Sequence, residues 1–418
     1  MIRALITDWG GVLMRTVDVR PRRAWERRLG LPPDGLHDLF FGGPGWRRAQ
    51  HGQATIADVW AEVAGQLALG DGDLAALSRD FWAGDQLDLE LVALIGELRR
   101  QGVRTALLSN FAASLADQLA GLGLDGVFDE IVISGREGSA KPEADIYRRT
   151  LGRLGVAPAE ALFLDDMGPN VRAARQLGME GVRFRGLRHL QRTLAAAGLP
   201  VEVPPLLPIP GLRAVIFDWG GVLSPLTFFQ HTQEWEQRLN LSPGTLERVL
   251  WGAEWKQYEI GALSPEQFDA HVARGLGLPD RAAVQQFYSA YYADDVLDRR
   301  VAAMARALRG RYRTGLLTNA FPGHADRVRD RYGFDPRSEF DVYVNSAEVG
   351  LAKPDPAIYQ LILDRLGVAP GEAVFLDDML RNTDAAQAMG IHTIVFADAD
   401  TGLADLAELL CLHGEAAV

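Results

Sequence analysis

The sequence predicts an α/β protein made of two tandem domains, each a doubly wound parallel sheet with a helical cap inserted after its first strand. Three observations support this fold class. An apolar run that ends in Asp-Trp-Gly-Gly occurs at Ala4–Leu13 and again at Ala214–Leu223. In both halves, short apolar runs alternate with stretches of helical spacing, as parallel strands joined by helical crossovers require. At 418 residues, the chain is also too long for one ordinary core.

The repetition extends over the whole chain. Asp8 recurs as Asp218, and Lys141 as Lys353, at offsets of 210 and 212 residues, so an entire domain is duplicated. Between the copies, residues 199–211 contain five prolines, which forbid a helix and favour an extended, semi-rigid connector. We therefore predict domains at 1–198 and 212–418, joined by a proline-rich linker at 199–211.

The apolar runs place the strands of both halves in matching order. Runs of four or so apolar residues are typical of buried parallel strands. After the first strand of each half, we expect strands at 105–108, 131–133, 161–164 and 181–184, matched by 314–317, 342–344, 373–376 and 392–396. Helical patterns at 146–154 and 358–366 would supply crossovers between them.

Two long segments interrupt this alternation, at about 15–88 and about 224–298. Both have helical spacing, and they align through the sequences that follow Trp25 and Trp235. We expect each to form a small helical cap inserted after the first strand. Large aromatic side chains dominate burial in small helical units. The aromatic residues expected in the cap cores are Trp46, Trp60, Trp82, Trp251, Trp255, Tyr291 and Tyr292.

Composition excludes several classes of protein. A net charge of -12 argues against a nucleic-acid surface spread over the molecule. No run approaches the roughly 20 apolar residues that a membrane helix needs, so we expect no membrane span. The single cysteine, Cys411, allows no internal disulfide and favours a reducing compartment. Few residues precede Asp8, which leaves no room for a signal peptide and favours a cytoplasmic location.

The first strand of each half ends on an aspartate followed by glycines. Asp8 and Asp218 are thereby placed at the carboxyl ends of strands, the edge where open α/β sheets bind ligands. The glycines leave backbone N–H groups unshielded, so that a phosphate or another anion can approach. The glycines predicted to bind the substrate in this way are Gly10, Gly11, Gly220 and Gly221. A strand followed by an Asp-Gly turn would explain one isolated copy without any function.

Three more polar motifs follow in the same order in each half. They are Ser109-Asn110, Lys141-Pro142 and Asp165-Asp166 with Asn170, repeated as Thr318-Asn319, Lys353-Pro354 and Asp377-Asp378 with Asn382. Alone, each has a structural explanation as a turn or a helix cap. Together they would converge on one crevice, where three carboxylates repel one another unless a cation joins them. Carboxylate oxygens suit Mg²⁺. The predicted magnesium ligands are Asp8, Asp165, Asp166, Asp218, Asp377 and Asp378.

These four elements, in this order and with a helical insert after the first strand, resemble the haloacid dehalogenase (HAD) superfamily, whose sheet is Rossmann-like. The resemblance covers nearly the whole chain. It implies that Asp8 and Asp218 are nucleophiles that form a covalent aspartyl intermediate. It also implies that Ser109 and Thr318 bind the phosphoryl group, that Lys141 and Lys353 steady nucleophile and phosphate, and that the Asp pairs hold magnesium. Asn110 and Asn319, which adjoin the phosphoryl-binding residues, are also predicted to bind the substrate, and Asn170 and Asn382 would support the Asp pairs.

One position departs from the family's phosphatases, which usually carry a second aspartate two residues after the nucleophile as general acid and base. This chain has Gly10 and Gly220 there, in which it is similar to sugar-phosphate phosphatases of the family. Glycine cannot transfer a proton, and general acid-base help is worth about 10²- to 10⁴-fold. A leaving group that needs little protonation, such as an anomeric oxygen, an acyl phosphate or a diphosphate, would suffer least.

The sequence therefore predicts a magnesium-dependent hydrolase of a small phosphorylated or diphosphorylated substrate, with two similar sites. One alternative uses the same metal site to ionise a diphosphate, as in a lyase or terpene cyclase. A second is a haloacid dehalogenase, although the dehalogenases lack the Asp pair that is present here. A third is a catalytically weak binding or scaffold protein. The duplication would also allow the halves to pair as an internal pseudo-dimer.

Overall fold

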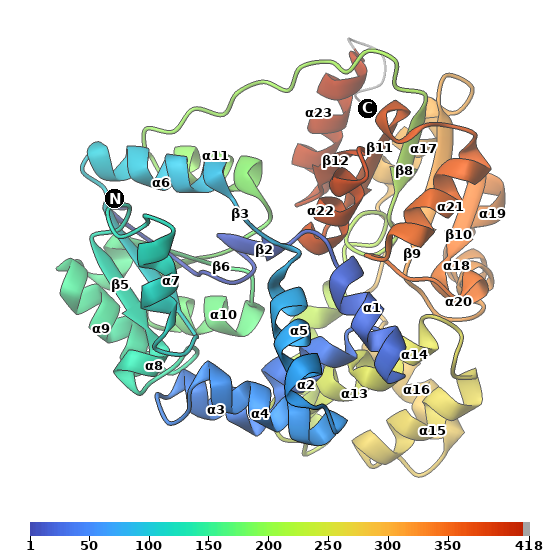
Figure 1. Ribbon diagram of the computed structural model, residues 1–418. Coiled ribbons are helices and arrows are strands. Elements are labelled where there is room, and N and C mark those ends of the chain that lie inside the picture. The colour runs from blue at the N-terminus through green and yellow to red at the C-terminus, as the bar shows by residue number, and fades with distance from the viewer. Residues whose placement is uncertain (413–418) are drawn as a thin grey trace. The chain divides into compact units, whose positions relative to one another are not determined.

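The computed structural model describes residues 1–412, apart from the side chains of residues 229 and 230. The chain forms two compact units, Met1–Pro204 and Pro205–Val418 (Figure 1). Their division falls inside the segment predicted as a linker. Leu206 and Ile209 in that segment donate backbone hydrogen bonds to Glu408 and Leu409 of the second unit.

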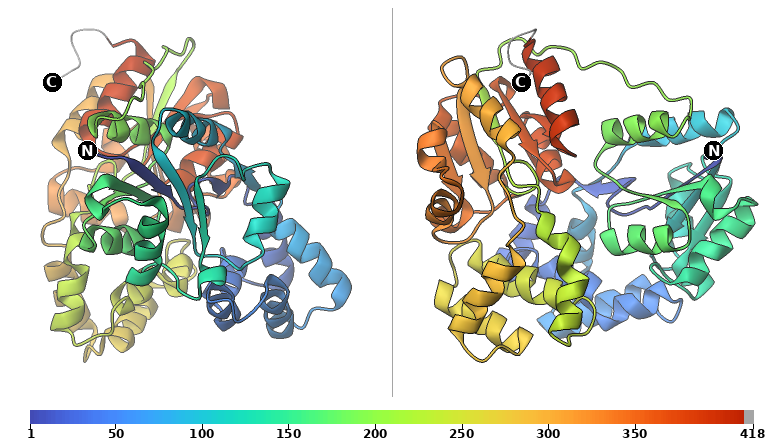
Figure 2. Two further views of the ribbon diagram at one scale, coloured as in Figure 1. Left: turned by 90° about the vertical axis from the view of Figure 1, so that its left-hand side faces the viewer. Right: turned by 180° about the vertical axis from the view of Figure 1, so that it is seen from behind.

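The first unit is built on a parallel sheet of five strands in the order β5-β4-β1-β6-β7. Ala4 of the central strand pairs with Arg104 on one side and Ala161 on the other. Its core strands are buried because helices cover both faces of the sheet (Figure 2). The strands are β1 (Ala4–Thr7), β4 (Arg104–Ser109), β5 (Glu130–Ile133), β6 (Ala161–Asp165) and β7 (Glu180–Arg183).

Helices connect these strands as crossovers. Ile146 and Leu151 pack with Ala4 and Ile6 in the apolar core on one face of the sheet. Two other helices, α6 and α11, lie on the opposite face (Figures 1 and 2). The helices are α6 (Leu89–Arg100), α7 (Leu115–Gly121), α8 (Ser134–Glu137), α9 (Ala144–Leu154), α10 (Gly168–Gln176) and α11 (Leu187–Ala196), with a 3-10 turn η1 (Pro158–Glu160).

The second unit repeats this architecture, with five parallel strands in the order β10-β9-β8-β11-β12. Two apolar clusters, one on each face, contain alternate residues of the central strand: Val215 and Phe217 on one side, Ala214 and Ile216 on the other. The elements are β8 (Ala214–Phe217), α17 (Arg299–Leu308), β9 (Arg313–Thr318), α18 (His324–Tyr332), α19 (Pro336–Glu339), β10 (Val342–Asn345), α20 (Ser346–Val349), α21 (Pro356–Leu366), η3 (Pro370–Glu372), β11 (Ala373–Asp377), α22 (Leu380–Ala388), β12 (His392–Val395) and α23 (Ala399–Leu410).

The segments predicted as caps are helical. In the first unit they lie between two short strands, β2 (Met14–Thr16) and β3 (Asp85–Leu87), which pair antiparallel. The helices of this segment are α1 (Arg20–Leu29), α2 (Gly35–Gly42), α3 (Pro44–Gln50), α4 (Ile56–Leu67) and α5 (Asp71–Trp82). Those of the second unit are η2 (Thr227–His231), α12 (Thr232–Arg238), α13 (Thr245–Trp251), α14 (Ala253–Tyr258), α15 (Pro265–Leu276) and α16 (Arg281–Tyr291).

Local sequence explains where these helices begin. Thr55 caps α4, accepting a hydrogen bond from the backbone of Asp58, whose carboxylate accepts one in return; Ser264 and Gln267 form the same capping box on α15. The aromatic residues expected inside the caps pack in apolar clusters. Trp46, Trp60 and Tyr291 are buried, while Trp82 contacts buried rings and Trp251, Trp255 and Tyr292 pack against a buried cluster. Within residues 1–412, no helix has both the length and the apolar character to cross a bilayer.

Candidate active sites

The central strands bring the predicted site residues to one edge of each sheet. Thr7, the last residue of β1, pairs with Leu107 of β4 and Leu164 of β6, so the three strands end side by side. The residues that follow them are therefore neighbours. The predicted residues at this edge are Asp8 after β1, Ser109 and Asn110 at the end of β4, and Asp165 and Asp166 at the end of β6, with matching positions in the second unit: Asp218, Thr318, Asn319, Asp377 and Asp378.

A buried lysine joins two of the strand ends. Nζ of Lys141 lies 2.7 Å from Oδ1 of Asp8 and 2.7 Å from Oδ2 of Asp165, and its side chain is fully buried. Burial alone would lower the pKa of Lys141, but the two carboxylates outweigh it and raise the pKa, so the lysine stays charged. The second unit repeats the bridge, with Lys353 Nζ at 2.8 Å from Asp218 and 2.6 Å from Asp377.

The carboxylate of Asp165 is held from several sides. Asn170 Nδ2 donates to both of its oxygens, at 3.1 and 3.0 Å, and the backbone N–H of Met167 donates to Oδ1 at 2.8 Å. Tyr147 in turn donates its hydroxyl to the backbone oxygen of Asn170 at 3.0 Å. The contacts recur in the second unit, through Asn382, Met379 and Tyr359.

Sequence reasoning missed the two tyrosines, Tyr147 and Tyr359. They are separated by 212 residues, the same offset as the paired lysines, which is the signal that could have revealed them. Both hydroxyls are donors to the backbone next to the acidic pair, which fixes the start of the helix that carries Asn170 or Asn382.

Asn110 and Asn319 were predicted to bind substrate, but their amides are bonded to the protein. Asn110 Nδ2 donates to the backbone oxygen of Lys141, and the Lys141 backbone N–H donates to Asn110 Oδ1, both at 2.7 Å. Asn319 makes the same pair of bonds to Lys353, at 2.9 and 2.8 Å. The amide therefore fixes the loop that delivers the lysine. Ser109 and Thr318, at the adjoining strand ends, are both buried.

The second glycine of each motif lies directly against the acidic pair. Gly11 and Gly221 have φ angles of +76° and +74°, a region that favours glycine. A β carbon on Gly11 would come 2.3 Å from Oδ2 of Asp166, and one on Gly221 would come 2.2 Å from Cγ of Asp378. No side chain larger than hydrogen fits at these positions without moving the carboxylate.

Three carboxylates crowd each site. One oxygen from each of Asp8, Asp165 and Asp166 lies within 4.8 Å of the others, and Asp218, Asp377 and Asp378 form the same cluster. Burial raises the pKa of Asp8 well above its usual range; Lys141 opposes this shift and the other two carboxylates add to it. Burial and Asp165 raise the pKa of Asp166 to about 6. One lysine does not neutralise three carboxylates, so this oxygen donor set fits a divalent cation such as Mg²⁺.

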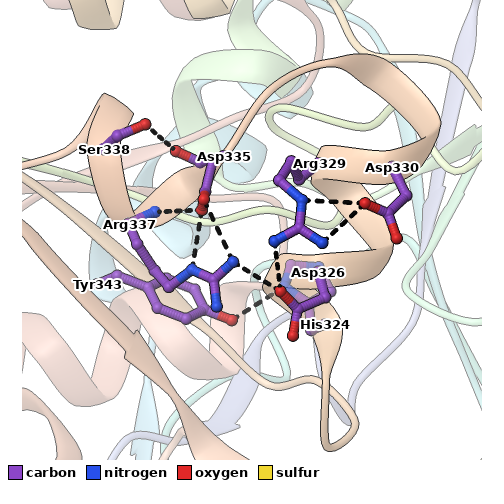
Figure 3. Close-up of polar contacts among 8 residues, drawn as sticks. All are labelled: His324, Asp326, Arg329, Asp330, Asp335, Arg337, Ser338 and Tyr343. Atoms are coloured by element: carbon purple, nitrogen blue, oxygen red, sulfur yellow. Dashed lines mark hydrogen bonds and ion pairs between the residues drawn. The ribbon is translucent and has the colours of Figure 1, made fainter.

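A buried histidine lies beside the loop that follows β8 in the second unit. The ring of His324 packs edge-on against Trp219, the neighbour of Asp218, with centroids 5.2 Å apart. Its Nδ1 lies 3.1 Å from the hydroxyl of Tyr343 (Figure 3). Burial and, to a smaller degree, Arg327 lower the pKa of His324 to about 3. Figure 3 also shows the ion pairs around it, which tie Arg329 and Arg337 to Asp326, Asp330 and Asp335.

Comparison with known proteins identifies the family. A family model described as haloacid dehalogenase-like hydrolase matches residues 2–178 and again residues 212–390. The chain belongs to this family. The predicted superfamily, its α/β fold and the tandem duplication are thereby confirmed.

Several characterised relatives of this haloacid dehalogenase-like hydrolase match about half of its chain. Acyl-CoA dehydrogenase family member 10 of Mus musculus is 34% identical over 210 residues, which are 47% of this chain and 19% of that protein. Sesquiterpene phosphatase astK of Aspergillus oryzae is 28% identical over 183 residues, covering 44% and 89% of the two chains. Drimenol cyclase drtB of Aspergillus calidoustus is 28% identical over 210 residues, covering 48% and 38%. The match therefore spans about a fifth of the mouse relative.

Proposed function

We propose that this haloacid dehalogenase-like hydrolase removes a phosphoryl group from a small phosphate ester, anhydride or diphosphate at two magnesium-dependent sites. The observation that carries the proposal is the buried lysine shared by Asp8 and Asp165, beside Asp166, and its repetition around Lys353. A fixed cation beside a nucleophile and an acidic pair suits a substrate that is itself an anion. The similarity to a sesquiterpene phosphatase supports the phosphate class.

Asp8 is the proposed nucleophile of the first site. Trp9 N–H and Lys141 Nζ both contact its Oδ1, each at 2.7 Å, which orients the carboxylate and directs Oδ2 toward the substrate. Oδ2 attacks phosphorus while the bond to the leaving oxygen breaks, giving an aspartyl phosphate. Water then attacks phosphorus, the bond between phosphorus and Asp8 breaks, and phosphate leaves with the carboxylate restored. Asp218 does the same in the second site, where Trp219 and Lys353 contact its Oδ1.

The other residues position these groups. Ser109 or Thr318 would donate a hydroxyl to the phosphoryl oxygens, and the lysine would hold positive charge beside them. Asn110 and Asn319 act through the lysine, because their amides bond its backbone. Asp8, Asp165 and Asp166, or their partners in the second unit, would hold Mg²⁺, which supplies charge neutralisation for the phosphoryl group when bound.

No carboxylic acid stands at Gly10 or Gly220 to protonate the leaving oxygen. The proton must come from water or from the substrate, so leaving groups that are stable as anions are favoured. Anomeric phosphates, acyl phosphates and diphosphates have this property. This is the finer substrate class that we propose.

A second candidate is ionisation of a prenyl diphosphate followed by rearrangement of its carbon skeleton. Two observations favour it: the similarity to a drimenol cyclase, and the absence of an acid at Gly10 and Gly220, which a departing diphosphate does not need. The products distinguish the two. Hydrolysis at phosphorus releases phosphate and leaves an unrearranged monophosphate or, after a second hydrolysis, the alcohol, whereas ionisation releases diphosphate and gives a cyclised or isomerised skeleton.

The experiment is a profile of phosphate release from sugar, acyl and aryl phosphates and prenyl diphosphates, with Mg²⁺ and with excess chelator. We would measure the native chain and the double variant Asp166→Asn/Asp378→Asn. Asp166 and Asp378 are chosen in place of Asp165 and Asp377. Replacing Asp165 would also break its ion pair with Lys141, so a loss of metal binding could not be told apart from a displaced lysine. We expect magnesium-dependent release by the native chain and loss of release by the variant.

The exposed residue Asp125 provides a control for the first unit, since Asp125→Asn removes one carboxylate from the surface, as Asp166→Asn removes one from the site. Equal release with chelator and with Mg²⁺ would contradict the metal assignment. Failure to release phosphate from every compound, with magnesium binding intact, would favour a binding protein over a hydrolase.

A further inference from the structure

The two sites share their charged residues but differ in what borders the first glycine. A β carbon built on Gly10 would meet no atom within 4 Å. One built on Gly220 would meet Cδ1 and Cδ2 of Leu226, both at 3.6 Å. Gly220 stands between Asp218 and Gly221, which touches the acidic pair. The side chain of Leu226 therefore lies along the edge of the second site, at a place that is open in the first.

The difference arises in the segment that leads from the glycines into the helical insert. In the first unit this segment forms the strand β2, where Arg15 pairs with Asp88 at 2.6 Å and the Thr16 hydroxyl donates to Asp85 at 2.6 Å. Thr16 is the counterpart of Leu226, at an offset of 210 residues. In the first unit, the position that corresponds to Leu226 thus carries a polar side chain whose hydroxyl is bonded to Asp85.

In the second unit the same segment turns sharply instead. Leu226 adopts a φ of +52°, unfavourable for a residue with a side chain, and the chain then enters η2. The packing of Leu226 against the apolar cluster of the insert, which contains Phe228, Tyr258 and Phe268, compensates for this conformation. Phe321, two residues after Asn319, packs on the same cluster. An aromatic ring also follows Asn110 in the first unit, where Phe111 packs on Trp46, so the difference between the two units lies at Leu226.

We propose that the second site prefers phosphate compounds whose alcohol portion is apolar next to the phosphoryl group, and that Leu226 determines this preference. The first site would take compounds with a polar, hydrated alcohol portion. This inference rests on the proposed phosphate hydrolysis. A leucine offers no hydrogen bond to a hydroxyl group and excludes water, so a polar alcohol bound against it loses its hydration without replacement.

The test uses full-length chains in which only one site works. Asp218→Asn leaves the first site and Asp8→Asn leaves the second. Each is assayed with Mg²⁺ on octyl phosphate and on the monophosphate of tri(ethylene glycol), which is similar in length but polar. The measured quantity is the ratio of kcat/KM for the two esters. Differences in leaving-group basicity cancel when the ratio at one site is divided by the ratio at the other.

We expect the octyl-to-glycol ratio to be about ten-fold higher at the second site, a normal size for discrimination by one apolar contact. Leu226→Asn should reduce this ratio at the second site, because asparagine tolerates the same φ but is polar. Leu226→Met is the matched control and should preserve it. In the first site, Thr16→Leu should raise the ratio relative to Thr16→Ser.

Each result decides between the claims. Equal ratios at the two native sites would overturn the inference and leave the proposed hydrolysis intact, whether or not the Leu226 variants fold. The ratio could instead be higher at the second site and stay the same in a folded Leu226→Asn chain. That result would show that Leu226 does not cause the preference. Phosphate release from acetyl phosphate, whose leaving group needs no protonation, but from neither ester would overturn this inference and leave the proposed hydrolysis intact. No release from any of the three compounds would overturn both.

Discussion

The carboxylate of Asp166 lies against the backbone of Gly11, so closely that a β carbon on Gly11 would come within 2.3 Å of its Oδ2. The same contact joins Asp378 to Gly221. The acidic pair and the glycine loop after the first strand are therefore in direct contact, although more than 150 residues separate them in each unit.

Replacing Gly11 by alanine should destabilise the first unit by about 1 kcal/mol or more, because its φ of +76° is unfavourable for alanine and Asp166 must move. Magnesium binding at that unit should weaken as well. Gly10→Ala is the control for stability, since its β carbon would meet no atom within 4 Å. Thermal melts and magnesium titrations of both variants check this. A melt of Gly11→Ala that matches the native chain would contradict the contact.

Removing the buried lysine should have a larger effect. Lys141→Met leaves Asp8 and Asp165 facing each other in a buried place without their cation, which typically costs about 3–5 kcal/mol. The unaltered second unit serves as the internal reference in the same melt. Added Mg²⁺ should restore part of the lost stability by supplying positive charge. If Lys141→Met unfolds like the native chain, these carboxylates are not stabilised by the lysine.

The pH dependence of that variant should follow from its carboxylates. Burial and the neighbouring carboxylates raise the pKa of Asp8, and without the opposing lysine they hold it above its value in the unfolded chain, so the folded state binds more protons than the unfolded state. Stability of the first unit in Lys141→Met should therefore increase as pH falls from 7 toward 5, relative to the native chain. Urea unfolding at several pH values measures the stability of both proteins. A difference in stability between them that stays the same from pH 7 to pH 5 would refute the prediction.

His324 should make the second unit sensitive to acid. Its pKa is lowered to about 3 by burial, against about 6.5 in an unfolded chain. The unfolded state therefore binds the extra proton between these values, and stability present above pH 6.5 is lost by up to about 1.4 kcal/mol per pH unit below it. His324→Leu, which copies Leu115 of the first unit, should flatten this slope. Equal slopes in urea titrations of both proteins would exclude His324 as the cause.

The glycine that replaces a general acid can be tested by supplying one. In a chain whose second site is removed by Asp218→Asn, rates should depend steeply on leaving-group pKa, because the departing oxygen is not protonated. Gly10→Asp should help poor leaving groups selectively, by up to about 10²-fold, since open space surrounds a β carbon at this position. A flat dependence for the native residue would show that another group supplies the proton.

Much of the fold was visible in the sequence because its strands are short apolar runs that end on polar residues. The run before Asp8 ends at the strand boundary found in the structure, and the run before Asp165 ends one residue short of it. Neighbouring parallel strands must end together, so the convergence of Asp8, Ser109 and Asp165 also followed from the order of the motifs.

What the sequence did not reveal depends on the conformation of single loops. Asn110 bonds the backbone of Lys141 across 31 residues, a contact that no local pattern encodes. The left-handed turn at Leu226 is invisible because leucine rarely adopts it, and only packing against the insert selects it. The burial of His324 likewise results from the aromatic rings of Trp219 and Phe321 that pack against it, and no feature of its own segment predicts it.

The duplication of the buried lysine has a practical consequence for genetics. If both proposed sites act on one compound, a screen that scores total release of phosphate from it would find each of Asp8, Lys141 and Asp165 dispensable, because the second copy remains intact after a single substitution. The most essential positions would then look as tolerant as surface ones. Redundancy of this kind also allows one copy to acquire a new substrate while the other keeps the original activity. The difference between Thr16 and Leu226 is a change that such redundancy permits.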